Sequence, residues 1–403
     1  MAKGPLTGVR VLEYCEYTAG PFCGKQFSDQ GAEVIKIERP EGEGARRRGP
    51  FFRDEANPEH SSEYLFNNTN KKSITLNLES ATGKEIFKKL VADTDILIED
   101  TAPGTFEALG LGYEILKEIN PGLIMASITP YGQTGPYRDY KAYYLNTFHG
   151  CGAGYLLPAD SPNTDREPIK MGGSMGESDI GLCAATGILG AYFWREFGGG
   201  TGQYIDISKQ EAEMAIERQN LMLYFESGKS KTRTGNSAVR DILITCGDGG
   251  CIKIVLLPEK QWLGLCRALG DPEWTKMEMF STDALRVKNY QHMKTYLTEA
   301  ASTYTAYELF AKIQAEGTAC APVCSAKQVY ESPQNEVREF FVEMDHPVVG
   351  KRAYPGIPYI TDTAPISDNF AAPLLGQHNE EILCGKLGYA KADLAKMREA
   401  GII

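Results

Sequence analysis

Long hydrophobic runs are missing from this chain of 403 residues, since no window approaches the ~18 apolar residues that a membrane span needs. The first residues, MAKGPLTGVRVLEY, lack the apolar core of a secretion signal and lead directly into a strand pattern. A net charge of −11 disfavours general binding to nucleic acid or to an anionic membrane. We therefore expect no nucleic-acid or membrane partner, and an anionic small molecule would need local basic residues.

Several common cofactor and nucleophile motifs are also absent. The first predicted strand ends in EYCEYTAGPFCG rather than in G-x-G-x-x-G, which disfavours a nicotinamide dehydrogenase. The sequence has no G-x-S-x-G elbow and no Walker A loop. Its five histidines show no metal-ligand spacing, and Cys320 and Cys324 have no second pair or histidine cluster beside them. We expect neither a metal nor a nicotinamide cofactor.

The ten cysteines are scattered, and several of them, such as Cys183 and Cys266, lie inside apolar segments. This usage is typical of reduced thiols in the cytoplasm rather than of a disulfide framework.

What the sequence does contain is an alternation of strand and helix patterns. Val9–Glu13 and Ala32–Glu38 read as buried strands, with a helical pattern over Ala19–Gln30 between them. Further strands are predicted at Ser73–Leu78, Asp95–Glu99, Leu123–Thr129 and Gln203–Ser208. The alternation predicts an α/β fold with a doubly wound parallel sheet. After Gly228 the pattern changes, and 228–325 is predicted to form a smaller α+β domain.

One stretch stands out chemically, Met171 to Gly187, with the sequence MGGSMGESDIGLCAATG. A glycine-rich turn places Glu177 at the start of a long apolar helix predicted over Glu177–Arg195. A carboxylate there lies where backbone N–H groups converge, which suits an anionic nucleophile or an anion-handling site. The run Arg46-Arg47-Arg48 is a candidate phosphate contact, with a solvated loop as the alternative.

The chain resembles the family III CoA-transferases, the group that includes formyl-CoA and carnitine CoA-transferases. The resemblance covers essentially all 403 residues. It is carried by AGPFCGKQFSDQGAEVIKIERPEGEGAR, NTNKKSITLNL, DILIEDTAPGTFEALGLGYEILKEINPGLIMASITPYGQTGPY, GQYIDISKQEAEM and APLLGQHNEEIL.

This resemblance implies a Rossmann-like CoA-binding domain built from 1–227 and 326–403, with 228–325 as the small domain. It also implies a dimer whose two chains thread through each other like linked rings. The implied substrates are an acyl-CoA and an organic acid. The enzyme carboxylate attacks the acyl-CoA, and CoA passes through an enzyme-bound anhydride and an enzyme thioester to the acid.

The family nucleophile is an aspartate four residues before a glycine, and here Glu177 stands four residues before Gly181. Glutamate keeps the carboxylate but displaces it by about one C–C bond, on the order of 1 Å. Other CoA-transferase families use a glutamyl thioester, and Asp179 is a secondary candidate.

CoA contacts are implied for Arg39, for Lys141 and Tyr143, and for Arg46 or Arg47. The implied binding set also includes Glu16, Tyr17, Thr18 and Asp100. A family arginine in P-G-x-x-x-R-x-G is replaced by Ala108.

Two hypotheses follow. In the first, the chain is an active CoA-transferase with Glu177 as nucleophile and, for example, succinyl-CoA as donor. In the second, it is a non-catalytic subunit of a heteromeric transferase, such as one for benzylsuccinate, whose partner chain carries the catalytic aspartate.

Overall fold

The computed structural model describes residues 4–158, 166–216, 218–230, 233, 241–362 and 369–403, and they fall into two compact units. The larger unit contains residues 1–155, 169–230 and 339–403. The smaller unit contains residues 156–168 and 231–338. The first and last segments of the chain therefore belong to one body, with the smaller unit inserted between them.

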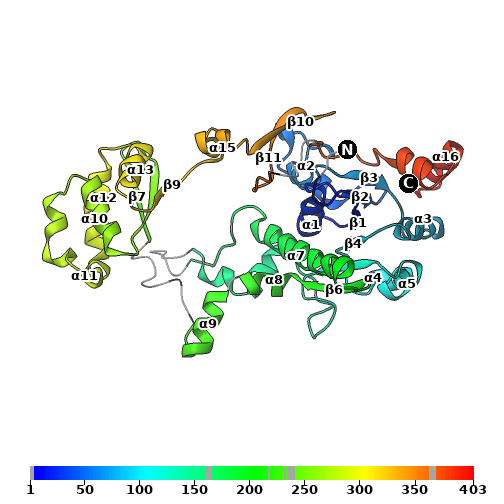
Figure 1. Ribbon diagram of the computed structural model, residues 1–403, viewed down its shortest axis with the longest axis horizontal. Helices are drawn as coiled ribbons and strands as arrows, with labels where there is room; N and C mark the ends of the chain where they lie inside the picture. The colour runs from blue at the N-terminus through cyan, green and yellow to red at the C-terminus, as the bar shows by residue number, and fades with distance from the viewer. Residues whose placement is uncertain (1–3, 159–165, 217, 231–232, 234–240, 363–368) are drawn as a thin grey trace. The chain divides into compact units, whose positions relative to one another are not determined.

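The larger unit is built on a six-stranded sheet with the order β3-β2-β1-β4-β5-β6, in which every neighbouring pair is parallel (Figure 1). The predicted α/β class and parallel sheet are thus confirmed. The strands are β1 Arg10–Tyr14, β2 Glu33–Glu38, β3 Lys72–Thr75, β4 Ile96–Glu99, β5 Ile124–Thr129 and β6 Gln203–Ser208.

Helices cover both faces of this sheet, as buried parallel strands require. On one face, α1 (Ala19–Ser28) and α7 (Met175–Phe197) pack on strand residues such as Val11, Ile98 and Ala126. The other face is covered by α3 (Ala81–Val91), α4 (Thr105–Leu109), α5 (Tyr113–Ile119) and α16 (Lys391–Glu399). Alternate strand residues point to opposite faces, so each strand contributes side chains to the hydrophobic core on either face of the sheet.

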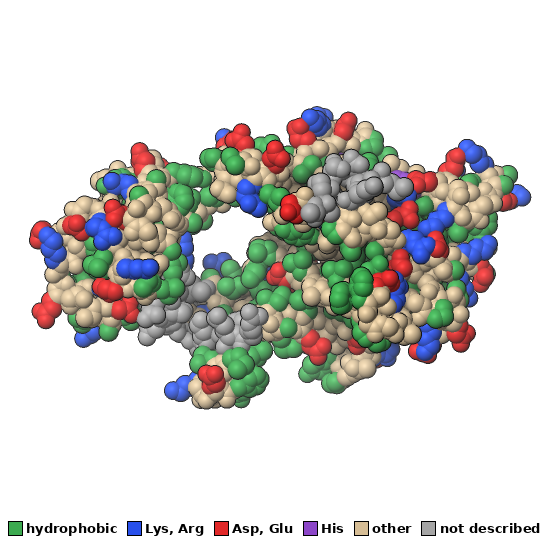
Figure 2. Space-filling model, in the orientation of Figure 1, with side chains coloured by type: hydrophobic (Ala, Val, Ile, Leu, Met, Phe, Trp, Pro, Cys, Tyr) green, Lys and Arg blue, Asp and Glu red, His purple; other side chains and the backbone are tan. Residues whose placement is uncertain are grey.

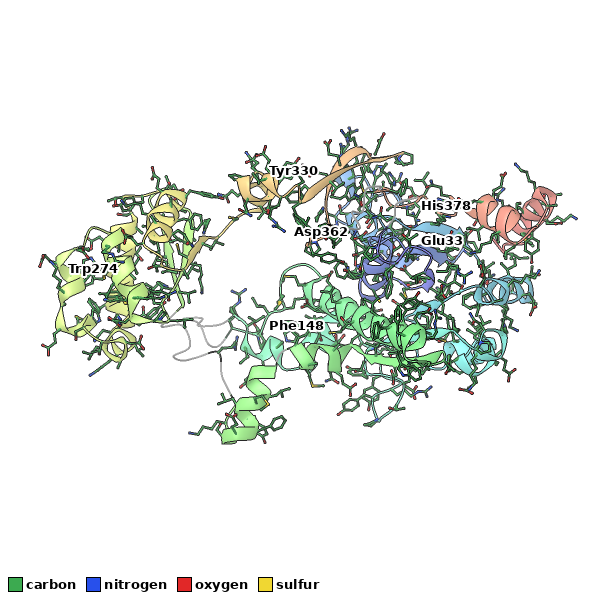
Figure 3. The ribbon with its side chains drawn as sticks, in the orientation of Figure 1. Glu33, Phe148, Trp274, Tyr330, Asp362 and His378 are labelled. Atoms are coloured by element: carbon green, nitrogen blue, oxygen red, sulfur yellow. The ribbon has the colours of Figure 1, made fainter. Side chains whose placement is uncertain are left out.

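The C-terminal segment is tied to the β3 edge of the sheet. His378 accepts a hydrogen bond at Nδ1 from Ser73 N at 3.1 Å, and its own N–H donates to Ser73 O at 2.9 Å. Lys386, in the helical turn Glu380–Lys386, lies 3.4 Å from Glu33 of β2. Figure 3 labels His378 and Glu33 at this junction. These contacts join the two ends of the chain in one unit.

The remaining elements of the larger unit are short helices and a hairpin. The hairpin pairs β10 (Phe341–His346) with β11 (Gly350–Pro355). The helices are α2 Ser62–Asn67, α6 Tyr144–Gly150, α8 Lys209–Ile216 and α9 Arg218–Ser227, with a 3-10 turn at Gly44–Arg47.

The smaller unit has its own core. An antiparallel sheet of β7 (Asp241–Thr245), β8 (Cys251–Val255) and β9 (Cys320–Pro322) packs on helices through Ile252, Ile254 and Leu309. Trp274 stacks on Tyr296 with ring centroids 5.4 Å apart, and Figure 3 labels Trp274. Its helices are α10 Glu259–Ala268, α11 Asp283–Lys288, α12 Tyr290–Ala301, α13 Ala306–Ala315, α14 Ala326–Tyr330 and α15 Pro333–Val337.

Helical periodicity in the sequence extends over 210–227 and 286–300. In the first stretch the structure describes α8 and α9, and residue 217 lies outside the described residues. The pattern over 286–300 forms α11 and α12, which meet at Asn289. The Asn289 side chain donates to the backbone oxygens of Leu285 and Met279, so it competes with helix continuation.

Among the described residues, no helix combines the length and the apolar character needed to cross a membrane. All ten cysteines lie in the described part of the chain, and none of them forms a disulfide. Figure 2 shows acidic and basic side chains interspersed over the visible surface of both units.

A buried charge cluster lies beneath the carboxyl end of β1. The Glu13 carboxylate is 2.9 Å from Lys36 Nζ and 2.8 Å from Lys71 Nζ, and all three side chains are fully buried. Burial lowers the pKa of Lys71 to about 8, although Glu13 opposes this shift. Lys36 also donates to Cys15 O at 2.9 Å, so the cluster holds the loop that follows β1.

The first prediction concerns this cluster. Replacing Glu13 by Ala leaves two buried ammonium groups without their shared carboxylate, which should lower the free energy of unfolding by about 3–5 kcal/mol. Urea denaturation measures the change. The control is Glu85→Ala, which removes an exposed partner of Lys88 and should cost no more than about 1 kcal/mol. Equal effects of the two substitutions would contradict the prediction.

Candidate active site

A large cleft of the larger unit opens at the carboxyl ends of β1 and β4, where the strand order reverses direction. Ligands of doubly wound sheets bind at such a switch point. The cleft has a volume of about 1230 Å³, which is large enough for a cofactor-sized ligand. Its wall includes the loop after β1, Asp100 after β4, Tyr143 before α6, Glu177 on α7 and Lys209 after β6.

The start of α7 is brought into this cleft by a close crossing of two helices. A Cβ atom on Gly181 would lie 2.7 Å from Ala19 O and 3.1 Å from Cys23 N of α1. Only glycine therefore lets the backbones of α7 and α1 approach this closely. Glu177 lies one turn before Gly181 on the same face of α7, so the crossing directs it toward the first residue of α1.

The Glu177 carboxylate is consequently bound by a different helix from the one that carries it. The sequence predicts a carboxylate at the N-terminus of its own helix, and Glu177 does lie in the first turn of α7. Its Oε2, however, accepts a hydrogen bond from Ala19 N, the first residue of α1, at 3.2 Å. The residue is 6% exposed. The dipole of α1 thus favours the carboxylate, and burial keeps most water away from it.

Lys209 is a site residue that the sequence analysis does not identify. It is the first residue of α8, directly after β6, and its Nζ donates to Glu177 Oε2 at 2.9 Å and to Oε1 at 3.1 Å. Burial by itself would lower the pKa of Lys209, but the Glu177 and Asp100 charges outweigh it and raise the pKa. The only available signal was a lysine immediately after the strand pattern QYIDIS.

The loop after β1 carries three of the predicted residues and is rigidly held. Asp100 accepts from Glu16 N at 3.1 Å with both carboxylate oxygens, and burial raises the pKa of Asp100 well above its usual range. Tyr17 adopts a left-handed backbone with φ of 66°, fixed by donation of its N–H to Glu43 Oε2 at 2.7 Å. Thr18 Oγ1 donates to Glu63 at 2.5 Å. Glu16, Tyr17, Thr18 and Asp100 all line the cleft.

The arginines divide between cleft and core. Arg39 lines the cleft, and its guanidinium lies 3.9 Å from Glu16. Arg46 is 1% exposed in the core, where it pairs with Glu38 at 2.6 Å and with Glu59 at 2.8 Å. Arg48 lines the cleft instead, 5.1 Å above the Tyr17 ring.

Four further predicted positions lie at or near the cleft edge. Tyr143 lines the cleft and is 78% exposed. Arg47 is exposed and donates to Glu41 O at 3.3 Å, and Lys141 is exposed next to the lining residue Ala142. Ala108 is exposed on α4, whose Thr105 and Leu109 line the cleft.

A second buried carboxylate, Glu213, lies behind the start of α7. A Cβ atom on Gly176 would be 2.7 Å from Glu213 Oε1 and 2.6 Å from the Tyr144 ring. Glu213 is 5% exposed, and in the described part of the chain neither carboxylate oxygen receives a well-formed hydrogen bond. Burial, and then the charge of Glu177, raise the pKa of Glu213 to about 7. Phe148 of α6, labelled in Figure 3, packs on Tyr144 with ring centroids 5.5 Å apart.

The second prediction is a pH dependence of stability. An acid with a raised pKa in the folded chain binds more protons folded than unfolded, so stability falls as pH rises from about 4.5 through about 7. Glu213→Gln removes this titration and should become more stable relative to wild type as pH increases. Melting temperatures of both proteins at about pH 5 and about pH 8 measure the effect. Glu211→Gln, at an exposed position on the same helix, is the control. Its difference in melting temperature from wild type should not change with pH.

Comparisons with known proteins identify the family of the chain. Residues 6–379 match the model of CoA-transferase family III. The chain is 32% identical, over 99% of its length and 98% of the relative's, to a succinyl-CoA–D-citramalate CoA-transferase of Chloroflexus aurantiacus. It is 30% identical, over 99% and 98%, to the beta subunit of a succinyl-CoA–L-malate CoA-transferase from the same bacterium.

A solved structure shares the fold over nearly the whole chain. It is a CAIB/BAIF family protein from Brucella suis, with a TM-score of 0.83 at 30% identity, covering 95% of this chain and 99% of that one. The resemblance inferred from the sequence motifs is therefore confirmed. The chain belongs to CoA-transferase family III, and so it is a CoA-transferase or a subunit of one.

Proposed function

We propose that this protein transfers CoA from succinyl-CoA to a carboxylic acid, with Glu177 as the nucleophile. The observation that carries the proposal is the buried Glu177 carboxylate at the cleft wall, held by Ala19 N–H and Lys209. Two relatives named as succinyl-CoA transferases support the donor, and the acceptors in their names are hydroxy dicarboxylic acids. The tyrosines at the cleft, Tyr17, Tyr143 and Tyr144, suit a bulkier acid equally well.

The chemistry follows from a carboxylate that is shielded from water. A Glu177 oxygen attacks the thioester carbonyl, the C–S bond breaks, and CoA leaves as a thiolate from a mixed anhydride. The thiolate then attacks Glu177 Cδ, the bond to the donor acyl group breaks, and the donor leaves as a carboxylate. The acceptor carboxylate reverses these steps on the glutamyl thioester. Burial protects the anhydride from hydrolysis.

The CoA phosphates need cations at the cleft mouth. Arg39 and Arg48 each have a side chain that is 56% exposed, so both are available to a phosphate. We assign them, with the backbone of residues 16–18, to CoA binding. Arg46 is occupied by core carboxylates and serves the fold in this proposal.

The third prediction tests the nucleophile directly. Incubation with succinyl-CoA should form a thioester at Glu177, which borohydride reduces to an alcohol that peptide mass spectrometry locates. Glu177→Gln should abolish turnover. Glu177→Asp withdraws the carboxylate by on the order of 1 Å and should lower kcat by about 100-fold. An unmodified Glu177, together with full turnover in Glu177→Ala, would rule out the proposal.

A second candidate is a supporting subunit of a heteromeric transferase. It is favoured by the ion pair that engages both oxygens of Glu177, by the alanine at position 108, and by the relative named as a beta subunit. In that case the catalytic carboxylate belongs to a homologous partner chain.

We further propose an interlocked dimer. α9 exposes a continuous apolar stretch from Leu221 to Phe225, with Phe225 72% exposed, and α7 exposes Phe193 and Phe197 near its end. Hydrophobic side chains on α9 are visible in Figure 2. Apolar patches of this kind mark protein interfaces. A second copy of this chain or a homologous chain would cover them.

The fourth prediction distinguishes the two candidates. If Glu177 is the nucleophile, the chain purified alone should be a dimer by light scattering and should show succinyl-CoA transferase activity. If the chain is a supporting subunit, activity should appear only when a homologous, aspartate-bearing chain is added. Full activity of the chain alone would reject the supporting-subunit candidate.

A further inference from the structure

Lys209 forms the closest charged contact of the proposed nucleophile. Its Nζ is bonded to both oxygens of Glu177, and the two side chains are 17% and 8% exposed. Among the described residues, Glu177 is the carboxylate within 4.0 Å of this ammonium group. We propose that Lys209 is a second catalytic residue, whose ammonium binds in turn the Glu177 carboxylate, the departing donor carboxylate and the incoming acceptor carboxylate. This inference rests on the proposed function.

Glu177 loses its negative charge during the reaction. In the resting site, one carboxylate and one ammonium group compensate each other. When Glu177 becomes a thioester it is neutral, and Lys209, whose side chain is 17% exposed at the cleft wall, loses its ion-pair partner. A buried unpaired ammonium is unfavourable, so the site then attracts an anion to the position next to Glu177 Cδ.

The other acidic groups near Lys209 are already engaged or held away. Asp100 adds negative charge near Lys209, but among the described residues the ion-pair partner within 4.0 Å is Glu177, and both Asp100 oxygens accept from Glu16 N. Glu213 lies one helical turn after Lys209, behind Gly176 and beside Tyr144. Cys15 is buried, and burial, followed by the charge of Asp100, raises the pKa of its thiol well above the usual range, which keeps it neutral. The anion that replaces Glu177 must therefore come from the substrate.

The donor carboxylate is formed at that position. It leaves Glu177 Cδ when the CoA thiolate attacks the anhydride, and Lys209 is within reach of both oxygens that Cδ carries. The acceptor carboxylate then takes its place and attacks Cδ, the C–S bond breaks, and the thiolate attacks the acceptor carbonyl to release Glu177. No proton is gained or lost in these steps, so Lys209 acts as a fixed positive charge rather than as an acid or base.

This role determines which acceptors the site takes. A single buried ammonium favours an anionic carboxylate over a neutral nucleophile such as water or an alcohol. Lys209 is thus expected to favour transfer over hydrolysis, whatever the remainder of the acid.

The fifth prediction uses Lys209→Met, which keeps the length of the side chain and removes its charge. The KM for the acceptor acid and the inhibition constant of free succinate should both rise by about 10- to 100-fold, because each loses a charge-assisted hydrogen bond. Hydrolysis of succinyl-CoA should increase relative to transfer. The borohydride-trapped Glu177 adduct should still form, which shows that the variant is folded.

Two further variants complete the experiment. In Lys209→Ala, added ethylammonium should restore part of the acceptor affinity, which a purely structural role would not allow. Lys117→Met makes the same chemical change on the exposed face of α5, where Lys117 pairs with Glu114, and should behave as wild type.

The possible outcomes distinguish a failure of the proposed role of Lys209 from a failure of the proposed function. A missing Glu177 thioester in the wild-type protein overturns both. A thioester that forms faster in Lys209→Met, with the acceptor KM and the succinate inhibition unchanged, overturns only the role of Lys209. In that case the ion pair merely restrains the nucleophile.

Discussion

Gly181 allows the backbone of α7 to lie against the backbone of α1, and the positions of the reacting groups follow from this contact. A Cβ atom on Gly181 would lie only 2.7 Å from Ala19 O and 3.1 Å from Cys23 N, so no larger residue fits at this crossing. Glu177, one turn earlier, then meets the first N–H of α1. Any larger residue at position 181 would separate the helices and withdraw the carboxylate from the cleft. The spacing of four residues between the two positions is therefore a packing requirement.

Buried charges hold the other wall of the cleft. Lys36 connects Glu13 and Glu43 and donates to Cys15 O, and Glu43 in turn binds Tyr17 N. The loop after β1 is thereby fixed in a backbone conformation that a tyrosine would otherwise avoid. Burying these charges costs desolvation free energy, and their mutual attraction offsets this cost only when every partner is present. The same arrangement that strains Tyr17 also presents the N-terminus of α1 to Glu177.

The three consecutive arginines take different positions in the structure. Arg46, Arg47 and Arg48 are chemically alike, and nothing in the sequence distinguishes them. The 3-10 turn over Gly44–Arg47 points Arg46 into the core toward Glu38, while Arg48 emerges at the cleft. The position of Lys209 and Glu213 at the site could not be predicted from the sequence for a related reason. They lie i, i+4 on a helix, a spacing that normally indicates a solvated face, but Glu213 is buried and the Lys209 side chain is only 17% exposed, and both lie beside the start of α7.

Hydrophobic periodicity indicated the α/β class and the six parallel strands, and the glycine-rich turn before an apolar helix indicated the Glu177 motif, because these depend on residues close together along the chain. The order of the strands, the crossing of α1 and α7, and the pairing of Glu177 with Lys209 were decided only by the tertiary structure. These features join residues that lie far apart in sequence, as Ala19 and Glu177 do, and local patterns carry no information about such contacts. A carboxylate in the first turn of a helix can accept hydrogen bonds from the N–H groups of its own helix or of a neighbouring helix. Here the close packing of α7 on α1 places Glu177 against the first N–H of α1.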